Sequence, residues 1–196
     1  METKVIGVIG GAGSGKSELL KIFEKKYHAC LLIADDIARE LSAPGGGSYK
    51  KIVEAFGEEI LNGDLTIDRK KLADLVSHQK ELLETLNGIT HPDVREEILR
   101  RMDAAKAEGY KYIVLEAALL VECGYRSLCD EFWYVYASED VRRQRMKSTR
   151  NYSDEKIDAI MRNQLSDAQF RENCDKVIEN NSTVENLEKE IEENLV

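Results

Sequence analysis

The stretch VIGVIGGAGSGKSELL, residues 5–20, places a cluster of glycines directly before Lys16 and Ser17. Glycine loses much conformational entropy on folding and adds no side chain to a core, so such a cluster needs a reason. Apolar residues typical of a buried strand precede the cluster, and apolar residues with helical spacing follow it, among them Leu19, Leu20 and Phe23. The stretch therefore predicts a strand, a glycine-rich loop and a helix in succession.

The glycine cluster fits the pattern GxxxxGK(S/T), in which Gly10, Gly15, Lys16 and Ser17 occupy the fixed positions. In this pattern the backbone N–H groups of the loop point at phosphate oxygens, and the N-terminus of the following helix adds partial positive charge. We expect Lys16 to bridge the β- and γ-phosphates and the Ser17 hydroxyl to bind Mg²⁺. The loop therefore predicts a nucleoside triphosphate site.

Short apolar runs elsewhere in the chain alternate with segments of helical periodicity. Such runs suit a parallel sheet that is covered by helices on both faces. The predicted fold class is α/β, a doubly wound three-layer α/β/α arrangement with a mainly parallel five-stranded sheet. The five expected strands are residues 4–9, 30–34, 112–119, 131–137 and 176–180.

Two segments do not fit this simple alternation. The first is residues 35–111, which is far longer than one crossover helix needs. The loop APGGGS opens this interval, and two helices are expected after it, separated by the breaker His91-Pro92. The second segment, residues 141–164, is rich in Arg and Lys and predicts a helix, a turn and a further helix starting near Ser153. We expect a core at about 1–42, 108–140 and 172–196, a helical insertion at about 43–107 and a lid at about 141–171. Ser182 and Glu185 predict a capping box before a last helix.

The composition limits the classes of partner. The chain of 196 residues has a formal net charge of -9, which argues against general binding to nucleic acid or to an anionic membrane. Its four cysteines form no CxxC pair, so buried thiols in a reducing compartment are expected. With no apolar run long enough for a membrane span and no signal segment, the sequence predicts a cytoplasmic protein.

Charged residues outside the loop indicate the chemistry. Asp35 and Asp36 follow the second strand, where a carboxylate can accept the proton of an attacking hydroxyl or help to hold Mg²⁺. The alternative is that these carboxylates cap the next helix, which we favour for Asp36. The guanidinium group of arginine matches the geometry of phosphate oxygens. The arginines of the basic segment therefore predict a lid over the phosphates. The alternative is that they form a solvated helical face. These arginines are Arg142, Arg143, Arg145 and Arg150.

These pieces, in this order, resemble the dephospho-CoA kinase family over nearly the whole chain. The resemblance rests on segments shared in register and not on the glycine loop alone. The segments are GGAGSGKS (10–17), ADDIAREL (34–41), PGGGSYKKIVEAFGEEIL (44–61), DLTIDRKKLADLV (64–76), THPDVREEI (90–98), ALLVECG (118–124), RNYS (150–153), Gln164 and CDKVIENN (174–181).

The resemblance implies transfer of the ATP γ-phosphoryl group, with Mg²⁺, to the ribose 3′-hydroxyl of the small molecule 3′-dephospho-CoA. It implies catalytic roles for Asp35 as general base, for Lys16 and for Arg150, with Mg²⁺ at Ser17 and Asp35. It assigns ATP binding to Gly11, Gly13, Ser14, Gly15, Lys16, Ser17, Glu18, Arg145 and Asn180. It assigns acceptor binding to Asp35, Arg69, His91, Arg95, Leu119 and Glu122. A packed turn histidine is the alternative for His91, and a monomer is expected.

The sequence departs from the family pattern at a few positions. Ile33 replaces the first aspartate of a DAD segment, Ala118 replaces a proline, and Glu18 stands where threonine is usual. The lid is also one residue longer between Arg145 and Arg150. These departures leave open a related kinase with another acceptor, or a nucleotide-binding paralogue without activity. A GTPase of the Ras or translation type is disfavoured, because the sequence has no NKxD segment.

Overall fold

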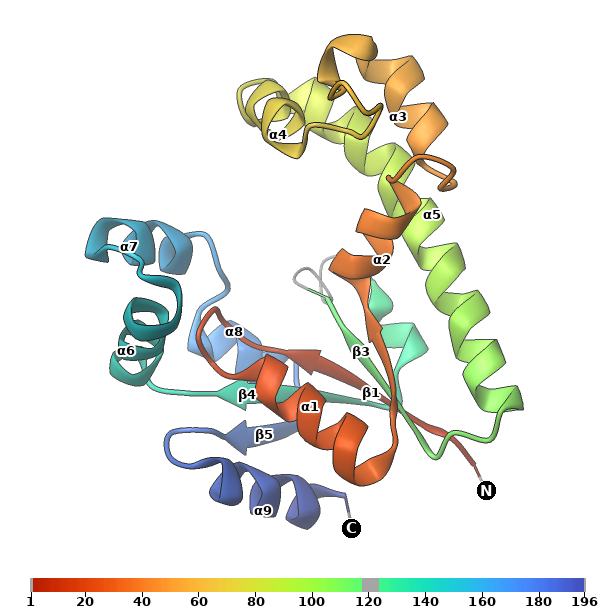
Figure 1. Cartoon of the computed structure of the whole chain (residues 1–196). Helices are drawn as coiled ribbons and strands as arrows, with labels where there is room; N and C mark the ends of the chain where they lie inside the picture. Colours follow the sequence, from red (N-terminus) through yellow and green to blue (C-terminus); the bar gives the residue numbers. More distant parts are fainter. Residues whose placement is uncertain (1, 118–123, 196) are drawn as a thin grey trace. The chain divides into compact units, whose positions relative to one another are not determined.

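The computed structural model describes residues 2–117 and 124–195 (Figure 1). Its strands are β1 (Lys4–Ile9), β2 (Cys30–Ile33), β3 (Tyr112–Glu116), β4 (Glu131–Tyr136) and β5 (Lys176–Glu179). Its α-helices are α1 (Lys16–Tyr27), α2 (Ala34–Leu41), α3 (Tyr49–Phe56), α4 (Arg69–Ser77), α5 (Lys80–Ala107), α6 (Glu139–Arg150), α7 (Asp154–Arg162), α8 (Asp167–Glu172) and α9 (Val184–Asn194). Two 3-10 helices are η1 (Glu58–Ile60) and η2 (Tyr125–Leu128).

The strands form a five-stranded sheet in the order β2-β3-β1-β4-β5. Strand β1 pairs in parallel with β3 and with β4, and β4 pairs in parallel with β5. The predicted α/β class and parallel sheet are therefore confirmed. The carboxyl ends of these strands lie along one edge, so the loop after β1 and the last residues of β3 and β5 are neighbours there. The end of the predicted strand 112–119 lies partly outside the described residues.

Helices cover both faces of the sheet, as the neighbours of two adjacent β4 residues show. Side chains of successive strand residues point to opposite faces. Trp133 meets the ring of Phe23 from α1, with ring centroids 5.6 Å apart. Tyr134 stacks on Phe170 from α8, with centroids 4.9 Å apart. Helices α1 and α8 therefore lie on opposite faces, and α9 lies beside α1 through hydrogen bonds from Lys26 to Glu188 and Glu192.

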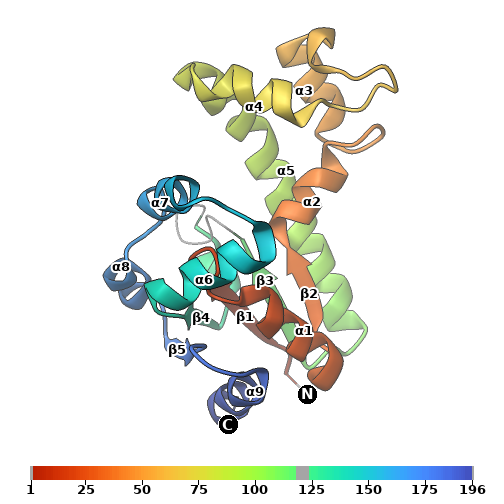
Figure 2. The same ribbon diagram turned by 60° about the vertical axis from the view of Figure 1, so that its left-hand side comes forward.

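The described chain divides into two compact units. The sheet unit comprises Met1–Leu32 and Ala105–Val196, and the helical unit comprises Ile33–Ala104. In the helical unit α3, η1, α4 and the first turns of α5 surround an apolar core of their own (Figure 2). That core consists of Ile52, Phe56, Ile60, Leu72 and Val76. The functional division into core, insertion and lid stays a prediction.

Helix α5 differs from the expectation of two helices. It runs without interruption over Lys80–Ala107 and contains Pro92. Proline removes one backbone donor and crowds the carbonyl four residues earlier, here that of Gly88, which normally kinks or breaks a helix. Apolar side chains pack on both sides of the proline, and this burial offsets the lost hydrogen bond. They are Leu82, Leu86 and Ile89 before it and Val94, Ile98 and Met102 after it.

The start of α9 also differs from the predicted capping box. The N-cap residue is Thr183, whose hydroxyl accepts a hydrogen bond from the backbone N–H of Asn186 at 3.4 Å. Ser182 lies one residue too early and instead accepts a hydrogen bond from the Asn186 side chain. Glu185 therefore has no part in a box with Ser182, because the helix begins one residue later than the pattern indicated.

An ionic cluster around Glu97 ties helices of the helical unit together. The Glu97 carboxylate accepts hydrogen bonds from Arg100 at 2.7 and 2.8 Å and from Arg101 at 2.7 Å. Arg101 also pairs with Glu40 of α2. Hydrogen bonds from Arg100, and then from Arg101, lower the pKa of Glu97 to about 2. The ionised carboxylate is therefore favoured in the folded state.

We expect Glu97→Gln to lower the free energy of unfolding at pH 7 by about 1 kcal/mol, the upper range for a partly exposed ion pair. The folded pKa lies below the ordinary value of 4.5, so the carboxylate stabilises the fold above that value. This contribution falls as the pH falls from about 4.5 toward 2. Urea unfolding at pH 7, 5 and 3 should show the same difference between wild type and variant at pH 7 and 5, and a smaller one at pH 3. Glu96→Gln, on the exposed neighbour, is the control, and a difference that is constant down to pH 3 contradicts the prediction.

Candidate active site

The glycine loop connects the end of β1 to the start of α1, in the predicted order of strand, loop and helix. Gly15 has a φ of 98°, a backbone conformation that residues with a Cβ rarely adopt. A Cβ on Gly15 would also lie 2.0 Å from the side-chain nitrogen of Asn180. The last glycine of the pattern is therefore required both by the loop conformation and by the close approach of the segment after β5.

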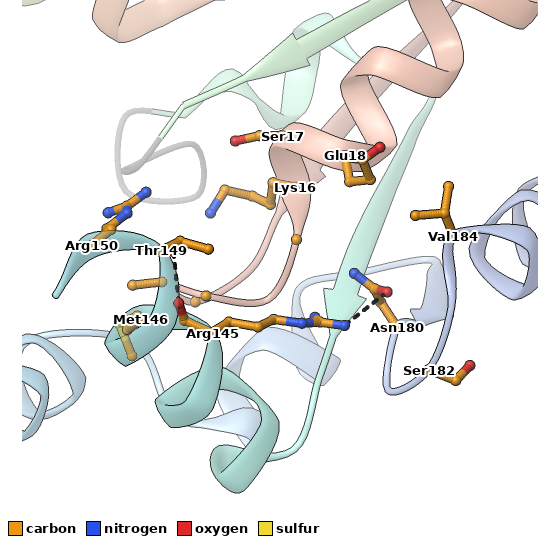
Figure 3. A pocket seen from close by; sticks show the side chains of 14 residues that line it. Lys16, Ser17, Glu18, Arg145, Met146, Thr149, Arg150, Asn180, Ser182 and Val184 are labelled. Carbon is orange, nitrogen blue, oxygen red and sulfur yellow. Dashed lines mark hydrogen bonds between the residues drawn. The ribbon is translucent and has the colours of Figure 1, made fainter. Parts of the chain in front are cut away.

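A cavity of about 400 Å³ lies between the loop, α6 and the start of α9 (Figure 3). Nine of the residues assigned to catalysis or to ATP from the sequence line it: Gly11, Gly13, Gly15, Lys16, Ser17, Glu18, Arg145, Arg150 and Asn180. Five residues that were not predicted also line it: Ala12, Met146, Thr149, Ser182 and Val184. Met146 is next to Arg145 in α6, and Thr149 lies one turn further along the same helix. Helical spacing from Arg145 could therefore have identified Thr149.

Lys16 is held at the phosphate end of this cavity by two oxygen atoms. Its Nζ donates a hydrogen bond to the carbonyl of Gly10 at 2.8 Å and lies 3.7 Å from a carboxylate oxygen of Glu116. Glu116 is the last residue of β3, and its side chain is only 15% exposed. Glu116 was not among the predicted site residues, although a carboxylate at the end of an apolar strand is the signal that singled out Asp35. Figure 3 shows the Lys16 side chain reaching toward the side of the cavity where Arg150 lies.

The other end of the cavity is built around the carbonyl of Ser14. This oxygen accepts hydrogen bonds from the Asn180 side chain at 2.8 Å and from Arg145 at 3.2 Å. Arg145 also donates to the Asn180 side-chain oxygen at 3.4 Å, the bond drawn in Figure 3. Burial lowers the pKa of Arg145, and Asn180 is only 6% exposed. The Ser14 hydroxyl is buried, and no described residue hydrogen-bonds to it.

The arginines of the basic segment have different surroundings. Arg143 faces α7 and pairs with Glu139 at 2.8 Å and Asp158 at 2.5 Å, away from the cavity. Arg145 and Arg150 line the cavity. Arg142 instead contacts the glycine loop, through a hydrogen bond to the carbonyl of Ala12. The segment therefore brings two of its four arginines to the cavity.

Asp35, Asp36 and His91 belong to the helical unit. Asp35 is exposed in the first turn of α2, while Asp36 pairs with Arg39 at 2.8 Å. The prediction that Asp36 caps this helix is wrong, because α2 begins directly after β2 and its N-cap position is Ile33. His91 is exposed within α5 and is not a turn residue, so the packed-turn alternative is also wrong.

Two further acceptor residues can be placed within the helical unit. Arg69 lines a mainly apolar cavity of about 280 Å³, and its guanidinium lies 3.4 Å from the Ser42 hydroxyl. Arg95 is partly buried on α5. Leu119 and Glu122, together with Ala118, lie outside the described residues.

Two features are absent from the described residues. Within residues 2–117 and 124–195, no three His, Cys, Asp or Glu side chains gather as a metal site would require. None of the helices described there combines the length and apolar character needed to cross a bilayer. The assignment of Ser17 and Asp35 to Mg²⁺ stays a prediction.

Comparison with known proteins gives consistent matches over nearly the whole chain. A family model described as dephospho-CoA kinase matches residues 4–186. A dephospho-CoA kinase from Carboxydothermus hydrogenoformans is 36% identical over 187 residues, covering 95% of this chain and 90% of that protein. A crystal structure from Thermus thermophilus has a TM-score of 0.83 at 26% identity and covers 100% of this chain and 97% of its own. A dephospho-CoA kinase from Campylobacter jejuni shares the fold, with a TM-score of 0.72 at 23% identity over 99% of this chain and 96% of its own. The chain belongs to the dephospho-CoA kinase family.

Proposed function

We propose that this chain transfers the γ-phosphoryl group of ATP to the ribose 3′-hydroxyl of 3′-dephospho-CoA and releases CoA and ADP. Family membership supports the reaction class. The observation that carries the proposal is the cavity of about 400 Å³, which combines the glycine loop and Lys16 with Arg145 and Arg150. Phosphoryl transfer needs cations around the transferring group and little covalent chemistry from the protein, and this cavity provides the cations.

The cavity suits ATP along its length. The loop N–H groups and the N-terminus of α1 suit the phosphates, and Lys16 is placed to contact them as a point charge. At the other end, Val184 offers apolar contact to a base. The Arg145 guanidinium is planar and can stack on that base, and Asn180 fixes its position through the bond of 3.4 Å. In this proposal Asn180 and Arg145 bind the adenine end, and Glu18 lies at the cavity wall.

The residues at the phosphate end fit Mg²⁺, which prefers oxygen ligands. Ser17 supplies a hydroxyl in the first turn of α1, and Glu116 supplies a carboxylate beside Lys16. When bound, Mg²⁺ neutralises charge on the β- and γ-phosphate oxygens. We propose Ser17 and Asp35 as ligands, directly or through water, with Glu116 as a further oxygen near them.

We propose that the helical unit binds the acceptor, within the predicted insertion at about 43–107, and that residues 141–171 form the lid. The cavity of about 280 Å³ is lined mainly by apolar side chains such as Ile52 and Leu72, with Arg69 among them. An apolar channel beside a cation suits a molecule that joins an extended pantetheine arm to a diphosphate. His91, Arg95, Leu119 and Glu122 are proposed to assist.

The chemical step needs a base for the acceptor hydroxyl and cations for the transferring group. We propose that the Asp35 carboxylate accepts the proton from the 3′-hydroxyl oxygen as that oxygen forms its bond to the γ-phosphorus. The bond between the γ-phosphorus and the bridging oxygen of ADP then breaks, and Lys16 and Arg150 stabilise the charge on the phosphoryl oxygens.

The test of this function is Mg²⁺-dependent ADP release from ATP, measured with and without 3′-dephospho-CoA, with the product identified by mass. We expect ADP release to be stimulated and a product heavier than the acceptor by one phosphoryl group, located on the 3′-oxygen. ATP binding without stimulation would indicate another acceptor or a chain without transfer activity. Phosphorylation at a different position would contradict the proposed acceptor geometry.

Asp35→Asn should lower kcat by at least about a hundredfold, because the amide cannot accept the proton of the acceptor hydroxyl. The dissociation constant of ATP, measured without Mg²⁺, should change by less than about twofold, because the substitution leaves the glycine loop intact. Steady-state kinetics and calorimetric titration with ATP measure the two quantities. The matched control is Asp36→Asn, which removes only the surface pair with Arg39. Equal rates for wild type and Asp35→Asn would contradict the assignment of the base.

Arg150→Ala should lower kcat by about a hundredfold, the usual effect of removing one group that stabilises the transferring phosphoryl. Arg143→Ala on the same helix is the control, since Arg143 is paired with α7 and should have little effect. Single-turnover rates with saturating ATP separate the chemical step from binding. A full single-turnover rate in Arg150→Ala would contradict the proposed role of Arg150.

A further inference from the structure

The backbone of Ala12, at the tip of the glycine loop, is held by two side chains from distant parts of the chain. Its N–H donates a hydrogen bond to the side-chain oxygen of Gln164 at 3.0 Å. Its carbonyl accepts a hydrogen bond from Nε of Arg142 at 2.8 Å. Arg142 also donates through Nη2 to the same Gln164 oxygen at 2.9 Å. One peptide segment of the loop is therefore fixed on both sides by a pair of residues that also bind each other.

The two side chains come from the predicted lid region. Arg142 lies in the first turn of α6, and Gln164 lies between α7 and α8. Neither is among the described residues that line the cavity, whereas Arg145 and Arg150 of α6 are. Burial lowers the pKa of Arg142, and desolvating a guanidinium costs free energy. The hydrogen bonds of this side chain go to the loop and to Gln164. The free energy lost on desolvating Arg142 is therefore offset by contacts that position the loop.

The contact between α6 and the loop also depends on two of the glycines. A Cβ on Gly11 would lie 2.3 Å from Nη2 of Arg142. A Cβ on Gly13 would lie 2.8 Å from the backbone carbonyl of Arg142. Gly13 therefore needs glycine for contact with the backbone of α6, while a side chain at Gly11 would displace the Arg142 guanidinium.

We propose that Arg142 and Gln164 are positioning residues that hold the glycine loop in its ATP-binding conformation before ATP binds. A loop with several glycines has much conformational freedom, and ordering it on binding would reduce the affinity for ATP. Fixing both polar groups of Ala12 removes part of that cost. The pair also makes the loop conformation depend on α6 and on the segment between α7 and α8. The inference rests on the ATP site of the proposed function but not on the identity of the acceptor.

The test measures the dissociation constant of Mg²⁺-ATP by calorimetry for Arg142→Ala, Gln164→Ala and the double variant of the full chain. Each single change should weaken binding by about tenfold, the size of one lost hydrogen bond to a partly buried group. The double variant should bind nearly as well as either single one, because each change alone releases the same peptide. Gln144→Ala, on an exposed residue of α6, is the control.

Two further measurements separate positioning from a merely structural role. Hydrogen exchange of the loop N–H groups should be faster in Arg142→Ala and Gln164→Ala than in wild type, with exchange in the sheet unchanged. Arg142→Lys, which keeps a donor and the charge, should recover part of the lost affinity and remains informative if an alanine variant does not fold.

An unchanged dissociation constant in a variant with a lowered melting temperature would overturn the inference, as would a double variant that loses the product of the two single effects. Binding of ATP is measured without an acceptor, so a chain that does not phosphorylate 3′-dephospho-CoA would contradict the proposed function and leave this test intact.

Discussion

The carbonyl oxygen of Ser14 is the point on which the nucleotide cavity depends. It receives hydrogen bonds from Asn180 after β5 and from Arg145 in α6, at 2.8 and 3.2 Å. The glycine at position 15 is what allows these side chains to come so close, since a Cβ there would meet Asn180. One backbone group thereby joins the loop after β1, the end of an outer strand and a helix of the basic segment. These parts can contact one another because the parallel sheet brings the carboxyl ends of its strands to one edge.

The two units differ in the size of their apolar cores. The sheet unit depends on a continuous apolar interior, in which Phe23 and Trp133 are fully buried. The helical unit has a smaller apolar core and adds charged contacts, such as that of Asp93 with Ser48 and Lys51. Ion pairs occur in the sheet unit as well, for example between Lys4 and Glu131 at 3.0 Å.

The features that could be predicted from the sequence are those that depend on neighbouring residues. Apolar runs located all five strands, and the spacing of Gly10, Gly15, Lys16 and Ser17 located the loop between β1 and α1. The uninterrupted α5 could not be predicted, because whether a proline breaks a helix depends on packing from elsewhere in the fold. The contact of Ala12 with Gln164 joins residues 152 positions apart, and no local pattern carries that information. Glu116 is an intermediate case, since its position at a strand end was visible while its approach to Lys16 was not.

The packing of Arg142 against the glycine loop limits how homologous chains can vary. Position 11 and position 142 share one volume, because a methyl group at Gly11 would overlap the guanidinium. A descendant that gains a side chain at position 11 must therefore shorten or displace the residue at position 142, and it then needs another donor for the carbonyl of Ala12. The two positions should therefore change together during divergence. An alignment of close relatives would show this contact as correlated substitutions at positions 11 and 142.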